Sequence, residues 1–339
     1  MEYIDLHLHL DGAITVDIAK KLAKLQGITM PESESELEKK IVVPSDCQSL
    51  NDFLKCFAFP LSLLQTPEGL SEAVRLVADH IMEQGVAYAE IRFAPQLHTE
   101  KGMTQEDAVL AALEGLKKTR LKCNLILCCM RGPKKAHLSQ DITSEVPFDK
   151  TDPNEETLRL AAKYLVEDGG VVAIDLAGAE ALFPTEDYRE LFARAKALGI
   201  PFTIHAGEAD GARSVKLAVE YGAKRIGHGV RSSEDPEVMA LLKQKGIPLE
   251  MCPTSNRMTH AVEDMSVYPL KSYLEQGLKV TLNTDDMAIE GITLAEEFAY
   301  AREALGMTRE QEKTVLQNAI DAAFTTRQVK EELSKKLYQ

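Results

Sequence analysis

The chain has 339 residues, of which 45% are hydrophobic and 27% are charged, and its formal net charge is −14. A chain of this length can bury a large core, either as one large α/β barrel or as two ordinary domains. The acidic balance, without a cluster of basic residues interleaved with aromatic ones, argues against a nucleic-acid partner. It favours a small neutral or cationic substrate.

The sequence also favours a cytoplasmic location. It begins Met1-Glu2-Tyr3, without the basic and apolar regions of a secretion signal, and its densest apolar run, residues 125–130, is too short to cross a bilayer. The six cysteines include no CxxC pair, which fits a reducing compartment. We therefore expect neither a membrane partner nor a disulfide framework.

The first predicted element is a strand over residues 4–9, where apolar and polar residues alternate. Side chains two positions apart leave the same face of a strand, so His7 and His9 can direct both imidazoles to one point. Such a pair suits a transition metal, zinc first, although two buried histidines that only hydrogen-bond to their neighbours are an equal alternative. A metal site needs further ligands elsewhere in the chain.

The rest of the chain alternates between strand and helix patterns. Seven further strands are predicted, over residues 86–93, 122–130, 171–176, 201–205, 225–228, 247–251 and 278–282. Helices are predicted over residues 15–26, 31–40, 67–84, 104–121, 151–168, 185–198, 211–221, from 235, over 293–305 and over 308–333. This alternation predicts an α/β protein, a (β/α)8 TIM barrel with additional helices, which we interpret as a single domain over residues 1–339.

A short apolar face precedes the second strand. It consists of Leu50, Phe53, Leu54 and Phe57, which recur at helical spacing within residues 49–57. A face of this kind is usually part of the core, but it could also form one wall of a pocket.

In a barrel of this kind, active-site residues lie at the carboxyl ends of the strands. The fifth strand ends in His205-Ala206-Gly207-Glu208, the sixth ends in Gly227-His228-Gly229, and Asn283-Thr284-Asp285-Asp286 follows the eighth. Half of the eight histidines therefore fall at predicted strand ends. The other four, His80, His98, His137 and His260, lie in helices or loops, where a surface or satisfied core histidine is the usual interpretation.

In these stretches the chain resembles the adenosine deaminase family of the metal-dependent amidohydrolase superfamily. The matching stretches run nearly from end to end and occur in the family's order. They are residues 7–13, 49–57, 88–95, 128–131, 174–178, 205–208, 225–229 and 283–286.

The resemblance implies a set of metal ligands and a reaction. It implies that His7, His9, His205 and Asp285 hold one Zn²⁺ per chain and leave a position for water, whose pKa zinc can lower to about 7. The reaction it implies is hydrolytic deamination of adenosine, and of 2′-deoxyadenosine, to inosine and ammonia in purine salvage. Hydroxide attacks C6 of the purine while protonated Glu208 donates to N1.

The resemblance assigns the remaining roles as follows. His228 accepts the proton of the water and stabilises the hydroxide, and Asp286 orients it and contacts N7. Asp11 and His9 lie near the ribose 5′-hydroxyl, and the backbone amide of Gly178 lies at purine N3. The simpler interpretations are a solvated loop carboxylate for Glu208, a carboxylate that supports a turn for Asp286, and a glycine needed for its dihedral angles at 178.

Two alternatives remain open at this point. The sequence departs from the pattern usual in the family at Ala58, Ala179 and His260, so the chain could instead deaminate adenine or a modified adenosine. Asp11 favours a ribosyl substrate, because adenine-specific relatives commonly carry glutamate at that position. A non-catalytic barrel that keeps a metal or senses a nucleoside is the other alternative, against which Glu208 and His228 argue together. The sequence does not indicate an oligomeric state.

Overall fold

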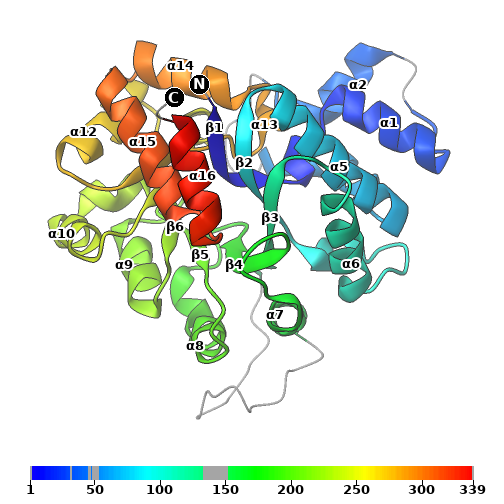
Figure 1. Cartoon of the computed structure of the whole chain (residues 1–339), viewed down its shortest axis with the longest axis horizontal. Coiled ribbons are helices and arrows are strands. Elements are labelled where there is room, and N and C mark those ends of the chain that lie inside the picture. Colours follow the sequence, from blue (N-terminus) through cyan, green and yellow to red (C-terminus); the bar gives the residue numbers. More distant parts are fainter. Residues whose placement is uncertain (1, 31–32, 45–46, 48–52, 133–151, 338–339) are drawn as a thin grey trace.

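The structure is a computed structural model that describes residues 2–30, 33–44, 47, 53–132 and 152–337 (Figure 1). In this part of the chain eight strands follow one another in sequence order, and every pair of neighbours is parallel. They are β1 (Tyr3–His9), β2 (Val86–Phe93), β3 (Lys122–Met130), β4 (Val171–Ala177), β5 (Thr203–Ala206), β6 (Arg225–His228), β7 (Leu249–Met251) and β8 (Val280–Leu282).

The strands close into a barrel. Strands β1 to β4 and β5 to β8 form two hydrogen-bonded sheets, and single bridges join them at both edges, between Ile174 and Phe202 and between Leu8 and Asp285. The predicted (β/α)8 barrel is confirmed. Strands β5 and β7 begin later than predicted, after Pro201 and Pro248, because proline has no N–H to donate to a neighbouring strand.

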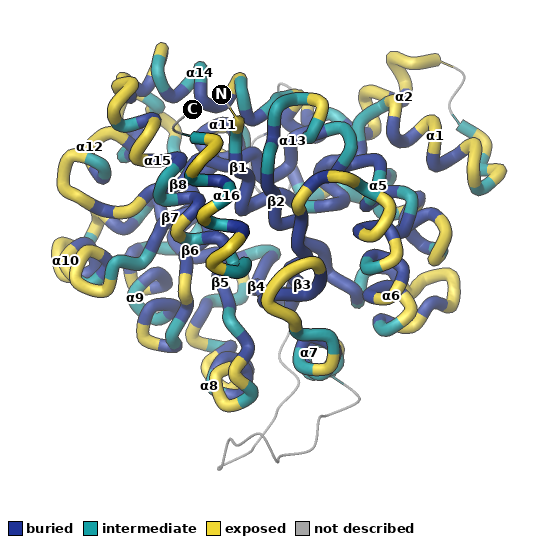
Figure 2. The backbone as a smooth tube through the Cα atoms, in the orientation of Figure 1, coloured by how far each residue is buried: buried dark blue, intermediate teal, exposed yellow. Residues whose placement is uncertain are grey.

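Helices surround the strands and carry most of the exposed residues, while the strands lie in the buried interior (Figure 2). The helices are α1 (Val16–Gln26), α2 (Glu34–Ile41), α4 (Ala58–Ser62), α5 (Pro67–Glu83), α6 (Gln105–Leu116), α7 (Pro153–Tyr164), α8 (Arg189–Ala197), α9 (Ala212–Tyr221), α10 (Pro236–Lys245), α11 (Pro253–Met258), α12 (Leu270–Glu275), α13 (Met287–Glu290), α14 (Leu294–Glu303), α15 (Arg309–Ala322) and α16 (Arg327–Leu337). Single 3₁₀ turns cover Asp11–Ala13, Leu54–Phe57, Pro95–His98, Thr185–Tyr188, Val230–Glu234 and Met265–Val267.

Local capping explains where several helices begin and end. The Thr15 side chain accepts from the N–H of Ile18 at the start of α1, and Gly27, with φ of 65°, ends the helix in the left-handed region. Thr104 and Asp107 form the reciprocal capping box that their spacing predicts. Of the predicted helix over 31–40, residues 31–32 lie outside the described residues, as do 49–52 of the apolar face and residue 151.

One predicted helix is wrong. Residues 308–333 form two helices, α15 and α16, with a break between them. At the break the Phe324 N–H donates to Glu90 at 2.5 Å, and the Phe324 carbonyl accepts from Asn124 Nδ2 at 3.0 Å. These contacts with side chains inside the amino-terminal end of the barrel replace helical hydrogen bonds, which the local sequence does not indicate.

The chain begins and ends on the same side of the barrel, where Lys336 Nζ of α16 lies 3.0 Å from Glu2 Oε2 (Figure 1). All six cysteines lie in the described part of the chain, and they form no disulfide there. Among the described helices, none is both long and apolar enough to cross a membrane.

Candidate metal centre and active site

The four residues predicted to bind metal converge at the carboxyl end of the barrel. His7 Nε2 lies 3.0 Å from His205 Nε2 and 3.2 Å from Asp285 Oδ1. His9 Nε2 lies 3.3 Å from His205 Nε2 and 3.4 Å from Asp285 Oδ1. Strands β1, β5 and the end of β8 therefore bring four potential ligands to one point, although 276 or more residues separate His7 and His9 from Asp285.

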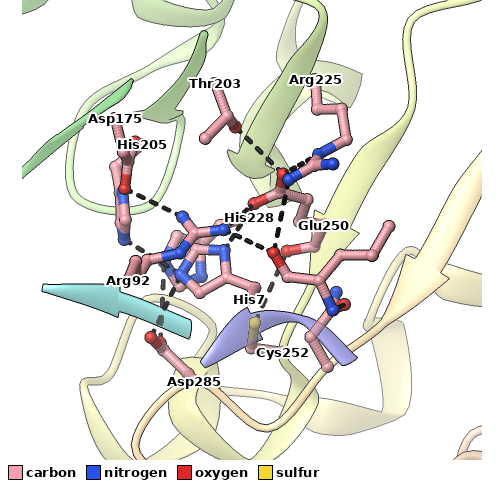
Figure 3. Close-up of polar contacts among 12 residues, drawn as sticks. His7, Arg92, Asp175, Thr203, His205, Arg225, His228, Glu250, Cys252 and Asp285 are labelled. Atoms are coloured by element: carbon pink, nitrogen blue, oxygen red, sulfur yellow. Dashed lines mark hydrogen bonds and ion pairs between the residues drawn. The ribbon is translucent and has the colours of Figure 1, made fainter. Parts of the chain in front are cut away.

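The other ring nitrogens of two of these histidines face buried carboxylates (Figure 3). His7 Nδ1 lies 2.7 Å from Glu250 Oε2, and His205 Nδ1 lies 2.8 Å from Asp175 Oδ2. Arg92 joins the two carboxylates, since it donates to Asp175 Oδ2 and to Glu250 Oε2 at 2.9 Å each. Carboxylates in this position orient a metal-binding imidazole and fix which nitrogen carries the proton.

The charges of these carboxylates are maintained in the interior by arginine. Burial alone would raise the pKa of Glu250, but Arg92 and Arg225 hold it well below its ordinary value. Burial likewise opposes ionisation of Asp175, and His205 and Arg92 lower its pKa instead. Arg225 also pairs with Glu90 at 2.6 Å. These two arginines and three carboxylates thus form one network of ion pairs.

The arrangement of the four ligand atoms fits a zinc ion. A ring proton on the Nδ1 atom that faces a carboxylate leaves a lone pair on Nε2 of His7 and on Nε2 of His205, and these two Nε2 atoms lie 3.0 Å apart. These electron-rich atoms repel one another unless a cation lies between them. Burial lowers the pKa of His9 well below its ordinary value, so its ring is also neutral, as a metal ligand requires. Three nitrogens and one carboxylate oxygen are a typical zinc donor set.

His228 lies beside this cluster. Its ligand atom lies within 4.8 Å of those of His7, His205 and Asp285, so these four residues could also hold a metal ion. His228 Nε2 lies 3.7 Å from Asp285 Oδ2 and 3.6 Å from Glu208 Oε2. The ring is held from behind, because Nδ1 lies 3.0 Å from Asn256 Nδ2.

Two of the site residues have unusual backbone conformations. His228 and Asp285 have φ of 60° and 65°, in the left-handed region that residues other than glycine rarely adopt. Such conformations cost on the order of 1–3 kcal/mol each and cluster at functional sites. They turn both side chains from the strand ends toward the cluster.

A buried group of carboxylates adjoins the cluster. Burial raises the pKa of Asp286 well above its ordinary value, and the nearby charge of Asp285 raises it further. Burial also raises the pKa of Asp11 to about 6. Asp286 approaches the main chain closely at Gly12, where a Cβ atom would lie 1.8 Å from Asp286 Oδ1. Only glycine at position 12 therefore permits this position of Asp286.

A pocket opens above the cluster. The predicted substrate and catalytic residues all line it, together with the described part of the apolar face; they are His9, Asp11, Phe53, Leu54, Phe57, Gly178, Glu208, His228 and Asp286. His7 is fully buried beneath it. Phe53 is also buried beside Ile289, so this face contributes both to packing and to the pocket wall. Gly178 has φ of 104°, which requires glycine whether or not a ligand approaches.

The sequence did not indicate the residues that contact the outer ring nitrogens of the site histidines. Glu250, Asp175 and Asn256 are fully buried, and none was singled out as functional. A signal was present, because a single acidic residue within an otherwise apolar buried strand needs a partner. Arg92 and Glu90 are likewise charged residues within a strand of the barrel, but the sequence does not show which partners they find.

Comparisons with known proteins agree with this geometry. The family model described as adenosine deaminase matches residues 3–339. An adenosine deaminase from Haemophilus ducreyi is 46% identical over 337 residues, which cover 97% of this chain and 94% of that protein. The structure resembles that of an adenine deaminase from Arthrobacter aurescens, with a TM-score of 0.83 and 27% identity over 99% of this chain and 98% of that one. An amidohydrolase from Burkholderia ambifaria with bound Zn has a TM-score of 0.81 at 21% identity, over 100% of this chain and 93% of that one.

The fold and the side chains at its carboxyl end define a (β/α)8-barrel enzyme with a possible metal site. Within that class, the chain belongs to the adenosine deaminase family, as the match over residues 3–339 and the 46% identical relative show. The resemblance seen in the sequence is confirmed.

Proposed function

We propose that residues 1–339 form one cytoplasmic hydrolase domain that deaminates adenosine, and 2′-deoxyadenosine, to inosine and ammonia with one Zn²⁺ per chain. The observation that carries this proposal is the convergence of His7, His9, His205 and Asp285 beneath a pocket that Glu208 and Asp286 also line. The adenosine deaminases among its relatives support adenosine as the substrate.

His7, His9, His205 and Asp285 would hold the zinc ion, with Glu250 and Asp175 orienting two of the imidazoles. Zinc bound there supplies hydroxide at neutral pH, because it lowers the pKa of water to about 7. Three of these ligands, His7, His205 and Asp285, are buried, and His9 is partly exposed at the pocket wall.

His228 and Glu208 divide the proton transfers in this proposal. His228 would take the proton of the attacking water and stabilise the hydroxide, and its Nδ1 lies 3.0 Å from Asn256 Nδ2. Glu208, whose Oε1 accepts from Thr259 Oγ1 at 3.2 Å, donates a proton to purine N1 as C6 becomes tetrahedral. Asp286 would orient the hydroxide and contact N7, and its side chain lines the pocket beside Asp285.

The substrate is held at two further points. The Gly178 N–H lies at purine N3, and its backbone conformation brings the main chain to the pocket wall without a side chain. Asp11 and His9 lie at the ribose 5′-hydroxyl, and Phe53, Leu54 and Phe57 cover the apolar faces of the nucleoside.

The test is to follow the ultraviolet absorbance of adenosine during incubation with the enzyme, before and after removal of metal by a chelator and after zinc is restored. We expect conversion to inosine that the chelator abolishes and zinc restores. No conversion by the zinc-loaded protein would contradict the proposal.

Adenine is the second candidate substrate, because the similar structure from Arthrobacter aurescens is that of an adenine deaminase. Measurement of kcat/KM for adenosine and for adenine under the same conditions separates the two. We expect a clear preference for adenosine, and a preference for adenine would reverse the assignment.

A further inference from the structure

Glu180 is a buried carboxylate in the loop that follows β4, two residues after Gly178. It is 1% exposed, and it accepts hydrogen bonds from four consecutive backbone N–H groups of the loop after β5. Its Oε1 accepts from Gly207 at 2.8 Å, and its Oε2 accepts at 3.1, 2.8 and 3.1 Å from the N–H groups of the residues 208, 209 and 210. Ser214 Oγ of α9 donates to Oε1 at 2.5 Å.

Four converging N–H groups form a concave site for an anion, of the kind that binds phosphate in other proteins. In this chain the anion is supplied internally. Burial alone would raise the pKa of Glu180, but Arg131, Ser214 and the backbone donors hold it below its ordinary value. Glu180 is therefore ionised at neutral pH, and each of its hydrogen bonds is charge-assisted.

The loop that Glu180 holds carries Glu208. Gly207 has φ of 72°, and a Cβ atom there would lie 2.6 Å from Val215 Cγ2, so the turn is tight as well as buried. With the N–H of Glu208 and those of its neighbours bound to Glu180, the Glu208 peptide cannot rotate without breaking several bonds at once. The direction in which Glu208 enters the pocket is set by this peptide.

We propose that Glu180 is a positioning residue for the deamination: it fixes the peptide that carries Glu208 and couples it to Gly178. This inference rests on the proposed role of Glu208 as the acid. Glu180 joins the loop that contains Gly178, the proposed contact to purine N3, to the loop that contains Glu208, the proposed acid at purine N1. One side chain therefore fixes the distance between the groups that bind these two ring atoms.

The test compares two substitutions of the same chemical kind. In Glu180→Gln one oxygen becomes an NH₂ group, which must face backbone N–H donors and cannot accept from them. Glu186→Gln is the matched control, because Glu186 pairs with Arg213 at the surface, where both side chains are exposed. Both proteins are prepared as the zinc-loaded enzyme, and their zinc content is measured.

The first readout is hydrogen exchange of the amides of residues 207–210. We expect protection in the wild type and exchange on the order of tenfold faster in Glu180→Gln, with no change in Glu186→Gln. If Glu180→Gln does not fold, Ser214→Ala replaces it in the test. This variant removes one of the five hydrogen bonds to Glu180 and should give a smaller increase in the exchange rate. If the amides of residues 207–210 are unprotected in the wild type, or if neither Glu180→Gln nor Ser214→Ala changes their exchange, Glu180 does not fix this loop.

The second readout is the kinetics with adenosine. We expect kcat of Glu180→Gln to fall about 10- to 100-fold, as for a misplaced catalytic group, while KM and zinc content stay near wild type. Rapid exchange with an unchanged kcat would show that Glu180 is merely structural. A zinc-loaded wild-type enzyme that is inactive on adenosine would instead contradict the proposed function, and with it the positioning role. The exchange data would still show whether Glu180 fixes the loop of residues 207–210.

Discussion

Arg92 Nη2 donates to Glu250 Oε2 at 2.9 Å, and the same carboxylate oxygen lies 2.7 Å from His7 Nδ1. The other terminal nitrogen of Arg92 binds Asp175, which faces His205. One planar guanidinium therefore fixes the carboxylates behind two of the proposed metal ligands, a geometry that lysine cannot reproduce.

We predict that Arg92→Lys weakens zinc binding. Lysine offers a single charged centre and can bind only one of the two buried carboxylates, so we expect about 10- to 100-fold lower zinc affinity, measured by competition with a chelator. Thr203→Val is the control, because it removes only one hydroxyl, 3.1 Å from the opposite oxygen of Glu250, and should leave the affinity near wild type. Equal affinities in Arg92→Lys and wild type would show that the bridge does not support the metal centre.

We predict that Glu208→Gln separates binding from chemistry. The amide keeps the size of the side chain but cannot supply a proton to N1, so kcat should fall about 10²- to 10⁴-fold. Zinc content and the Kd for inosine should change little, because Glu208 is not a proposed metal ligand and the amide can still hydrogen-bond to the purine. A near wild-type kcat would refute Glu208 as the acid. Absence of turnover in the wild type as well would favour the alternative of a barrel that only binds its ligand.

We predict that Asp11→Ala lowers the preference for a nucleoside. Loss of a hydrogen bond between a charged carboxylate and the 5′-hydroxyl costs about 1.5–3 kcal/mol, so kcat/KM for adenosine should fall about 10- to 100-fold. The ribose-free base makes no such contact, and the low rate with adenine should not change. Equal losses with both substrates would place Asp11 in a general role at the pocket.

We predict an acid-sensitive contribution to stability from His98. This buried ring donates from Nδ1 to the Leu64 carbonyl at 3.1 Å, and burial lowers its pKa from 6.5 to about 4. Between these values the unfolded chain binds a proton that the folded chain does not. The free energy of unfolding therefore falls by about 3 kcal/mol as the pH decreases through this window, and His98 has no effect above about pH 7.

The measurement is denaturant unfolding of wild type and His98→Gln from pH 4 to pH 7.5. Glutamine is neutral throughout and can still donate to the Leu64 carbonyl, so the difference in unfolding free energy between the two proteins should change across the window. Groups that titrate in both proteins cancel in this difference. The same comparison for His80→Gln, at a half-buried position, should give a smaller change, and a flat difference for His98 would refute the buried neutral ring.

Strand–helix alternation and the alternate spacing of His7 and His9 were enough to predict the barrel and one face of the site, because both depend on side chains near in sequence. The positions of His205, His228 and Asp285 at strand ends also followed, since parallel strands of a barrel present their carboxyl ends together. The end of α15 could not be predicted, because Phe324 is held by Glu90 and Asn124 from distant strands.

By itself, then, the sequence determined the order of elements and the residue types at the carboxyl end of the barrel, because local periodicity and family motifs carry that information. Only the tertiary structure decided what those residues touch. The pairing of Arg92 with Glu250 and of Glu180 with the peptide of Glu208 depends on backbone groups and charges brought together from separate strands and loops. Such contacts are selected by burial, which requires each polar group to find a partner wherever the closed barrel places one.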